Sequence, residues 1–507
     1  MYPLRDYQTE VVRNTYSLIR QKVTKILIFA PTGAGKTVIA TKIVCDAVSR
    51  GRKVLFVVHR DILVSQTHAK FSAVGLKCGF IKAGWERNKD ASVQIASVQT
   101  LLVRHDWREL SISLIVLDEC HIIAFHKISQ QMMEKIFPQA IYLGLTATPW
   151  RLSKKESLGD IFQGLVCAPM PGKLIEEGFL AKPSYYSLDF QANLQDVELT
   201  DGDYNSYQLS RICDRTELIE QAVNSWYDLA YSRPTIAFAV GVKHARNLVA
   251  AFEAHGITAA SVTGSTPIKE RNRLYEQLAG GDLKLLASCE ALSEGFDVPE
   301  VSCVILSRPT KSKALYFQQL GRGLRLSPDK RGCLVLDQAQ NVLEHGFIED
   351  LTEADVELIP SSSNCSSDEK KKAPLKICPQ EKGGCGNYVY AVYLKCPHCQ
   401  FNFDLERLIT VLGSNRSIKP EDEIKLNYYR SLLRDAIQCA RAPSWAAMKF
   451  KDKYGFFPLY DWARDAIYGG DRSSIPLYEE YLKTVASRLN KNRDWIDKYL
   501  YLEFGKI

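Results

Sequence analysis

The sequence of 507 residues lacks the features of several protein classes. No apolar run approaches the roughly 20 residues that a membrane-spanning helix needs. The N-terminal residues Met1–Asp6 have no apolar core of the kind found in a signal peptide, and no segment repeats along the chain. A membrane protein, a secreted protein and a repeat array are therefore unexpected, and a cytoplasmic location is predicted.

A strong charge of one sign is also missing. The formal net charge is +7, which is modest for this length and permits a polyanionic partner without requiring one. With 46% hydrophobic and 24% charged residues, the composition is that of a globular protein. The length leaves room for roughly three domains, each able to bury its own core.

Cysteine is present in number, but a disulfide framework is not expected. The chain has 14 cysteines, and without a signal sequence they are predicted to be reduced thiols. Most stand singly among apolar residues, as Cys45, Cys167 and Cys303 do, and are expected in the core. The group between Cys378 and Cys399 has a different spacing and is considered below.

One glycine-rich segment stands between an expected strand and an expected helix. Residues 26–29 are apolar, residues 30–37 read Ala-Pro-Thr-Gly-Ala-Gly-Lys-Thr, and residues 38–44 have a helical pattern. Glycines let successive backbone N–H groups face a phosphate, and the helix N-terminus adds partial positive charge. The segment departs from the usual phosphate-loop pattern at Ala30, which stands in place of a glycine. The expected phosphate-binding residues are Thr32, Gly33, Ala34, Gly35, Lys36 and Thr37, with Lys36 on the outer phosphates and the Thr37 hydroxyl on Mg²⁺.

Two adjacent acids end another buried strand. The apolar run 114–117 leads directly into Asp118 and Glu119. Burying two acids side by side is costly unless a cation or an acid–base task accounts for them. Beside a phosphate loop, Asp118 is expected to hold Mg²⁺ and Glu119 to polarise the attacking water. His121 is expected to link this site to neighbouring residues by hydrogen bonds.

Polar residues follow three further expected strands of the first half. Ligands bind open α/β sheets at the carboxyl ends of the strands. The residues concerned are His59 and Arg60 after strand 53–58, residues 97–100 after strand 93–96, and residues 146–149 after strand 140–145.

Gln8 lies at the start of the first expected helix. Its side-chain amide has both the donor and the acceptor that an adenine edge needs.

These segments together resemble the superfamily 2 helicases. Gln8, residues 30–37, residues 118–121 and residues 146–149 match motifs Q, I, II and III of that family in wording, order and spacing. Several segments resemble the bacterial and phage branch related to the XPB-type DNA helicases. These segments are Thr146–Arg151, Phe238-Ala239-Val240, Ser265-Thr266-Pro267, Arg308–Ser312 and Leu336-Asp337.

The second half continues the pattern. Strands and helices alternate between residues 235 and 288, which predicts a parallel sheet with helices on both faces. Residues 294–299 resemble motif V, and residues 318–325 resemble motif VI. The interval between Arg322 and Arg325 is expected to place both guanidinium groups on one face of a helix.

The resemblance covers about residues 1–350 and implies two RecA-like domains with ATP and Mg²⁺ between them, in a bacterial or phage-infected cell. Nucleic acid would cross the face away from ATP, held by contacts that ignore base identity. The resemblance implies that ATP is met by Gln8, residues 32–37, Asp118 and Glu119 on one side, and by Gly295, Asp297, Gln318, Arg322 and Arg325 on the other. The expected nucleic-acid contacts are His59, Arg60, Ser97, Gln99, Thr100, Thr263, Gly264 and Ser288.

The last third is of a different kind. Cys378 and Cys385 precede Cys396 and Cys399, and the second pair has the spacing of a metal knuckle. A structural four-cysteine zinc ribbon is predicted, with unpaired or redox-active thiols as alternatives. The remainder reads as helical, and aromatic and basic residues around Trp445 and Lys453 fit either a core or a nucleic-acid contact. No nuclease motif is recognisable there.

The predicted fold is therefore α/β, with two tandem RecA-like parallel-sheet domains, a zinc ribbon and a helical C-terminal region. The predicted function is that of an ATP-dependent DNA helicase or translocase. An RNA helicase, an ATP-gated nucleic-acid clamp and the motor subunit of a restriction-type complex remain alternatives. The predicted boundaries are 1–175 and 231–355 for the two RecA-like domains, 176–230 for a connecting region, 356–374 for a linker, 375–402 for the ribbon and 403–507 for the helical region.

Overall fold

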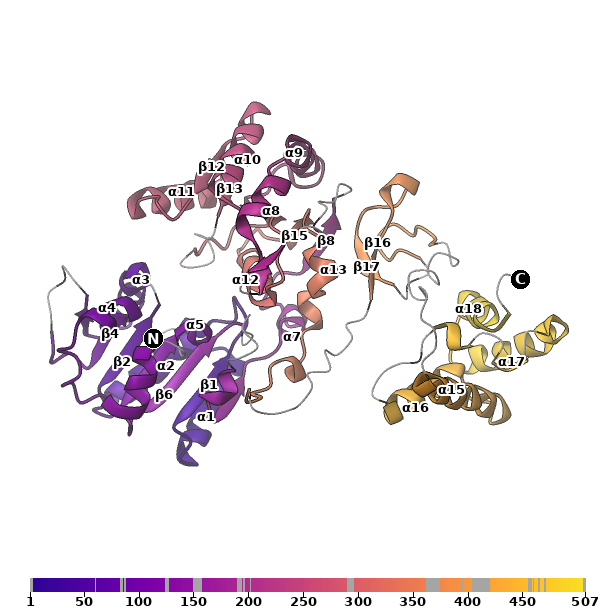
Figure 1. The fold of residues 1–507 in the computed structure, drawn as a ribbon, viewed down its shortest axis with the longest axis horizontal. Coiled ribbons are helices and arrows are strands. Elements are labelled where there is room, and N and C mark those ends of the chain that lie inside the picture. The colour runs from indigo at the N-terminus through magenta and orange to yellow at the C-terminus, as the bar shows by residue number, and fades with distance from the viewer. Residues whose placement is uncertain are drawn as a thin grey trace. The chain divides into compact units, whose positions relative to one another are not determined.

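The computed structural model contains two parallel sheets, each with its own helices (Figure 1). No helix among the described residues has both the length and the apolar character that a membrane span needs. The structure describes the whole chain except residues 1–2, 60, 83–84, 86–87, 124–126, 149–156, 189–193, 195–196, 201, 290–295, 362–373, 392, 394, 404–419, 455–457, 459, 464–465, 469–470 and 505–507.

The first lobe, defined as residues 6–167, is built on a seven-stranded parallel sheet of order β3-β4-β2-β5-β6-β1-β7. Its central strands are buried along most of their length, which explains their continuous apolar sequences. The strands are β1 (Lys25–Phe29), β2 (Val54–Val58), β3 (Cys78–Ile81), β4 (Val93–Ser97), β5 (Leu114–Asp118), β6 (Ile141–Thr146) and β7 (Gly164–Cys167). The helices are α1 (Asp6–Arg20), α2 (Lys36–Ser49), α3 (Asp61–Ser72), α4 (Val98–Val103), α5 (Cys120–Ile123) and α6 (Lys127–Gln131), which continues as the π-helical η1 (Met132–Ile136).

The second lobe, defined as residues 183–345, is built on a six-stranded parallel sheet of order β12-β13-β11-β14-β15-β8. The two sheets confirm the predicted pair of α/β domains. The strands are β8 (Pro183–Ser187), β11 (Thr235–Phe238), β12 (Ala259–Val262), β13 (Leu285–Ser288), β14 (Cys303–Leu306) and β15 (Cys333–Asp337). The helices are α8 (Ser206–Cys213), α9 (Thr216–Ala230), α10 (Val242–Ala254), α11 (Ile268–Gly280), α12 (Lys313–Gly323) and α13 (Asn341–His345).

Short elements connect and extend the two lobes. Helix α7 (Pro171–Glu176) follows the first sheet, and the hairpin of β9 (Leu199–Thr200) and β10 (Asp203–Tyr204) follows β8. The hairpin is held to the second lobe by Asp203, whose carboxylate accepts hydrogen bonds from the Thr310 hydroxyl (2.9 Å) and the Lys311 amide (2.7 Å). The remaining short turns are η2 (Leu158–Asp160), η4 (Ile348–Asp350) and η5 (Glu353–Asp355).

A small two-stranded sheet, β16 (Leu375–Ile377) and β17 (Tyr388–Tyr390), carries the turn η6 (Gln380–Lys382) between its strands. Residues 375–388 pack against the edge of the second lobe. The Ser187 amide donates to the Gly386 carbonyl (2.9 Å), and the Tyr388 hydroxyl donates to the buried Asp337 carboxylate (3.1 Å). Strand β8 therefore has the small sheet on one side and β15 on the other.

The C-terminal part is helical, as predicted. Its helices are α15 (Pro420–Gln438), α16 (Pro443–Tyr454), α17 (Ile475–Arg488) and α18 (Arg493–Phe504), with the short turns η7 (Tyr460–Ala463) and η8 (Arg472–Ser474). Phe450 lies at the centre of one aromatic cluster and contacts the rings of Tyr429, Tyr454 and Trp462. Buried Glu503 accepts hydrogen bonds from the three consecutive amides of residues 466–468. The aromatic residues near Trp445 thus serve in large part as a core.

Candidate active site and metal centre

The glycine-rich loop joins β1 to α2, in the strand–loop–helix order expected of a phosphate-binding loop. Gly33 and Gly35 have φ angles of +88° and +84°, in the left-handed region that residues with a side chain rarely adopt. Gly35 is also the N-cap of α2, so the first amides of this helix face the loop without a capping side chain. The loop therefore offers backbone donors and a helix N-terminus to an anion.

Lys36 and Glu119 meet at the carboxyl edge of the first sheet. The Lys36 Nζ lies 2.7 Å from Glu119 Oε1, across 83 residues of sequence. Glu119 follows β5 directly and has a φ of +49°, which is unusual for a residue with a side chain. Such backbone conformations cost free energy and are found disproportionately at functional sites. The turn after β5 is thus held in a conformation that aims the second acid at the phosphate loop.

The two adjacent acids are shifted in opposite directions. Burial and, to a lesser extent, the Glu119 charge raise the pKa of Asp118 to about 6, although the Lys36 ammonium opposes the rise. Burial also acts to raise the pKa of Glu119, but the charges of Lys36, His121 and Arg322 outweigh it and lower this pKa to about 2. A cation bound at Asp118 would stabilise the ionised form of this acid. Glu119 is ionised already, as a general base needs to be.

His121, which follows the acid pair in sequence, forms a hydrogen bond to the end of β6, in line with the prediction for this residue. Its Nδ1 lies 3.0 Å from the Thr146 hydroxyl, which itself donates to the Thr148 carbonyl (2.8 Å). Because the hydroxyl hydrogen is used in that bond, Nδ1 of His121 is the donor to Thr146. The Gln318 side chain donates to the Thr148 hydroxyl at 3.4 Å, which extends the chain of contacts to the second lobe.

The second lobe meets the phosphate loop through α12. A Cβ placed on Gly321 would lie 2.3 Å from the Cβ of Thr32, so the two lobes touch at these residues. Beside this contact, the Arg322 and Arg325 guanidinium groups both donate to the Phe296 carbonyl, at 3.0 and 2.9 Å, and Arg325 also pairs with Asp297 at 2.8 Å. We call this meeting place of the lobes the seam.

One expectation about the arginines was wrong in detail. Helix α12 ends at Gly323, so Arg325 lies beyond the helix and not on a helical face shared with Arg322. The chain turns after Leu324, and the two guanidinium groups converge through the Phe296 carbonyl instead. Gly295, the other predicted residue of this segment, lies outside the described residues.

Gln8 lies against the phosphate loop. Its side-chain nitrogen donates to the Ala34 carbonyl (3.1 Å), and its side-chain oxygen accepts from the Arg5 amide (3.1 Å). The Tyr7 hydroxyl donates to the same Ala34 carbonyl at 2.9 Å. In this structure the Gln8 amide thus supports the loop. Phe179 was not predicted to lie near this site, but its ring lies 4.7 Å from the Arg5 guanidinium and 5.3 Å from the Tyr7 ring.

Comparisons with known proteins agree with this geometry. The family described as "Type III restriction enzyme, res subunit" matches residues 1–151, and the family described as "Helicase conserved C-terminal domain" matches residues 215–327. A Lactococcus phage protein described as "51.5 kDa protein" is 30% identical over 329 residues, which are 63% of this chain and 67% of that protein. The chain belongs to the superfamily 2 helicases.

Other relatives of this helicase chain are longer or more distant. The Saccharomyces cerevisiae protein named "Putative ATP-dependent helicase IRC3" is 29% identical over 66% of this chain, and the match spans only 51% of that protein. "DNA 3'-5' translocase XPB2" of Sulfurisphaera tokodaii is 22% identical over 66% of this chain and 80% of that protein. The "fragment structure of a putative HsdR subunit of a type I restriction enzyme from Vibrio vulnificus YJ016" shares the fold, with a TM-score of 0.54, 20% identity and coverage of 68% of this chain and 67% of that one.

The helicase chain also places its predicted nucleic-acid residues on neighbouring strands. In the first lobe, Val58 pairs with Ser97, so His59 and the start of α4 lie at one edge of the sheet. In the second lobe, Val262 pairs with Ser288, which brings Thr263 and Gly264 beside Ser288. Each lobe thus groups its residues at the carboxyl ends of two adjacent strands.

The exposure of these residues differs. Gln99 and Gly264 are exposed, and Thr100 is half-buried. Ser97 is fully buried, and its hydroxyl caps α4 by accepting from the Thr100 amide (3.2 Å). His59, Thr263 and Ser288 are also buried, and Arg60 lies outside the described residues.

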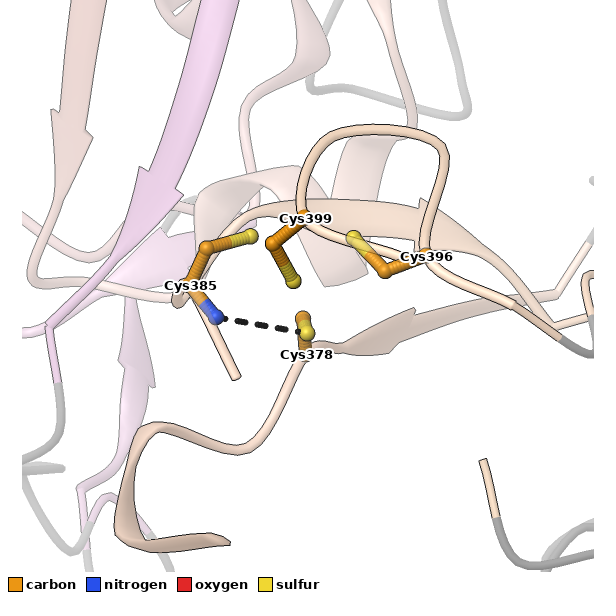
Figure 2. A group of neighbouring side chains, drawn as sticks. All are labelled: Cys378, Cys385, Cys396 and Cys399. Carbon is orange, nitrogen blue, oxygen red and sulfur yellow. Dashed lines mark hydrogen bonds between the residues drawn. The ribbon is translucent and has the colours of Figure 1, made fainter. Parts of the chain in front are cut away.

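The four grouped cysteines converge on one centre. Figure 2 shows the side chains of Cys378, Cys385, Cys396 and Cys399 facing one another, and their sulfur atoms all lie within 4.8 Å of each other. Four thiolates around Zn²⁺ at about 2.3 Å would stand about 3.8 Å apart, so a small closure would complete a tetrahedron. The Cys385 backbone amide donates to the Cys378 sulfur (3.4 Å), and the Asn387 side-chain Nδ2 donates to the Cys385 sulfur (3.1 Å). Donors of this kind favour thiolates over thiols.

The long interval between the first two cysteines is accommodated by η6. This turn reverses the chain after Cys378, and the Gly386 amide then donates to the Cys378 carbonyl (3.0 Å). The six intervening residues therefore form a closed loop, and the donor set fits a structural zinc site.

Proposed function

We propose that this chain is an ATP-dependent DNA helicase or translocase, which couples ATP hydrolysis to movement on DNA or to its unwinding, annealing or branch remodelling. The observation that carries the proposal is the seam. There the phosphate loop and the Lys36–Glu119 pair of the first lobe face the arginine segment of the second lobe, in contact at Thr32 and Gly321. A triphosphate bound at the loop would be met by residues of both lobes.

Each residue at the seam has a chemical task in this proposal. Lys36 binds the outer phosphates, for which it leaves the Glu119 carboxylate, and Glu119 is then available to take a proton from the attacking water. Thr37 and Asp118 would hold Mg²⁺, which neutralises charge on the phosphates when bound. Arg322 and Arg325 stabilise the charge on the transferred phosphoryl group.

Movement would follow from the difference between ATP and its products. Interactions of both lobes with the terminal phosphate favour the closed seam only while that phosphate is attached. A series of contacts runs from Glu119 through His121, Thr146 and Thr148 to Gln318. Through these contacts a change at the seam would reach the end of β6. The strand ends near Gln99 and Gly264 supply the proposed contacts to the nucleic-acid backbone, which carry no sequence information.

DNA is proposed over RNA because several relatives carry DNA in their names. They include "DNA 3'-5' translocase XPB2" and "ATP-dependent DNA helicase RecG" of Escherichia coli, which is 24% identical over 59% of this chain. The match of residues 1–151 to a restriction-enzyme family favours one second candidate, the motor subunit of a restriction-type assembly. Such a subunit would be expected to co-purify with a partner chain.

The test of the proposal is a comparison of nucleic acids. ATPase activity of the full chain is measured with single-stranded, forked and duplex DNA and with RNA of the same sequence. DNA is expected to stimulate hydrolysis more strongly than RNA, and ATP is expected to drive displacement of a protein block from DNA. Stronger stimulation by RNA would favour an RNA helicase, and stimulation without strand separation or displacement would favour a clamp.

The cysteine site carries a separate prediction. Atomic spectroscopy of the purified chain is expected to find one bound Zn²⁺, because structural zinc sites of this type bind with about 10–16 kcal/mol in peptides. The Cys396→Ser variant is expected to lose most of the metal. The Cys439→Ser variant, which changes an exposed thiol in the helical region, is the control and is expected to retain it. Equal metal content in the two variants, or none in the wild type, would contradict the zinc assignment.

A further inference from the structure

Lys330 has an unusual set of partners. It lies in the loop between α12 and β15, and its ammonium donates to three backbone carbonyls. The acceptors are Pro299 (3.1 Å), Val301 (2.5 Å) and Arg325 (2.6 Å). All three N–H groups of the ammonium are therefore used, and all on main-chain oxygen atoms.

Those three carbonyls belong to the two segments that form the second lobe's side of the seam. Pro299 and Val301 follow Phe296 and Asp297, which accept hydrogen bonds from the arginine side chains. The third carbonyl is that of Arg325 itself. The arginine side chains thus bind one segment to the other, and Lys330 binds the same two segments through their backbone carbonyls.

A lysine is well suited to this position. Its ammonium is compact and offers three donors from one atom, whereas the planar fork of arginine spreads its donors over a wider area. These part-buried carbonyls need donors, because a carbonyl removed from water and left without a partner destabilises the fold. The neighbouring Arg331 is exposed, so of these two adjacent cations Lys330 is the one that binds the three carbonyls.

Arg325 depends on such support more than Arg322 does. Arg322 lies within α12, whose hydrogen bonds fix its backbone. Arg325 lies beyond the end of that helix, where no helical hydrogen bond orients it, and its carbonyl is held by Lys330. For the Arg325 guanidinium to move from Phe296 and Asp297 to a phosphate, its backbone needs to stay in place while the side chain turns.

We propose that Lys330 is a positioning residue for ATP hydrolysis, which acts by fixing the backbone of Arg325 against the segment 299–301. The inference rests on the function proposed above. A group that misplaces a catalytic side chain by about 1 Å can cost about 100-fold in rate, so the Lys330→Met variant is expected to lower kcat by about that factor. The KM for ATP is expected to change little, because the phosphate loop is on the other lobe.

The experiment measures single-turnover ATP hydrolysis, with thermal melting of each variant to set a temperature at which all are folded. Lys330→Gln, which keeps two N–H donors, is expected to be intermediate between Lys330→Met and wild type. Arg331→Met, which removes the adjacent exposed cation, is the matched control and is expected to keep the wild-type rate.

A double-mutant cycle separates positioning from a general structural role. If Lys330 acts through Arg325, Lys330→Met is expected to add no further loss to the Arg325→Ala variant. An equal loss in both backgrounds, or a wild-type rate for folded Lys330→Met, would overturn the inference. If Arg325→Ala itself hydrolyses ATP at the wild-type rate, the proposed role of Arg325 fails instead, so the two failures are distinguishable.

Discussion

The Glu119→Gln variant is expected to lower kcat for ATP hydrolysis by about 10²–10⁴-fold, which is the usual contribution of a general base. The substitution keeps the size and planarity of the side chain but removes its negative charge and its ability to take a proton. Glu119 is the acid whose pKa is lowered, so it is ionised throughout the neutral range and available as a base. Phosphate release at saturating ATP and DNA is the measurement.

ATP binding is expected to respond differently. In the wild type, Lys36 forms an ion pair with Glu119 at 2.7 Å, and ATP competes with that carboxylate for the ammonium. Removing the charge of Glu119 frees Lys36, so the Kd for a non-hydrolysable analogue is expected to stay the same or fall. A lost rate combined with equal or tighter binding would identify a catalytic group, because a folding defect weakens both.

A matched control lies on α2. Asp46 forms an ion pair with Lys42 at 2.6 Å, with both side chains partly exposed to solvent. The Asp46→Asn variant makes the same chemical change, in a lysine pair on the same helix that bears Lys36, but away from the phosphate loop. It is expected to keep the wild-type kcat. A Glu119→Gln variant that also kept it would contradict the assignment of the base.

The sequence was sufficient for the parts of the fold that local patterns determine. Strands such as β2 and β5 are buried on both faces, so their apolar residues run without interruption and predict a parallel sheet. The same reasoning located Asp118 and Glu119 at a carboxyl edge. Hydrogen bonds from His121 to neighbouring residues were also predicted, but its partner Thr146 was identified only by the structure. The catalytic roles assigned to these residues remain predictions.

Other features depend on contacts between distant residues, which no local pattern reveals. Strand β8 lies in a segment predicted to be a mixed connection, because its sequence Pro-Ser-Tyr-Tyr-Ser contains no apolar run. Its place is set by pairing with β15, about 150 residues later. Phe179 and Lys330 were missed for the same reason, since their partners Tyr7 and Pro299 are specified only by the folded chain.

The Arg322→Ala variant is expected to show the largest loss of all, about 10³–10⁵-fold in kcat, which is the range for arginine fingers in phosphoryl transfer. Arg322 is buried, lies in the turn of α12 that touches Thr32, and contributes to the lowered pKa of Glu119. Its guanidinium is thus close to the first lobe's acid even without a bound nucleotide.

Folding is expected to survive this substitution. The Phe296 carbonyl accepts from both arginines, so after the loss of Arg322 it keeps its bond from Arg325 at 2.9 Å. Arg322→Lys restores the charge without the planar fork and is expected to recover little of the rate. Arg273→Ala removes an exposed arginine paired with Glu270 on α11, in the same lobe, and serves as the control with an unchanged rate. Analogue binding near the wild-type level together with a kcat within tenfold of wild type would show that Arg322 does not act on the transition state. The seam would then bind ATP without using the second lobe for its hydrolysis.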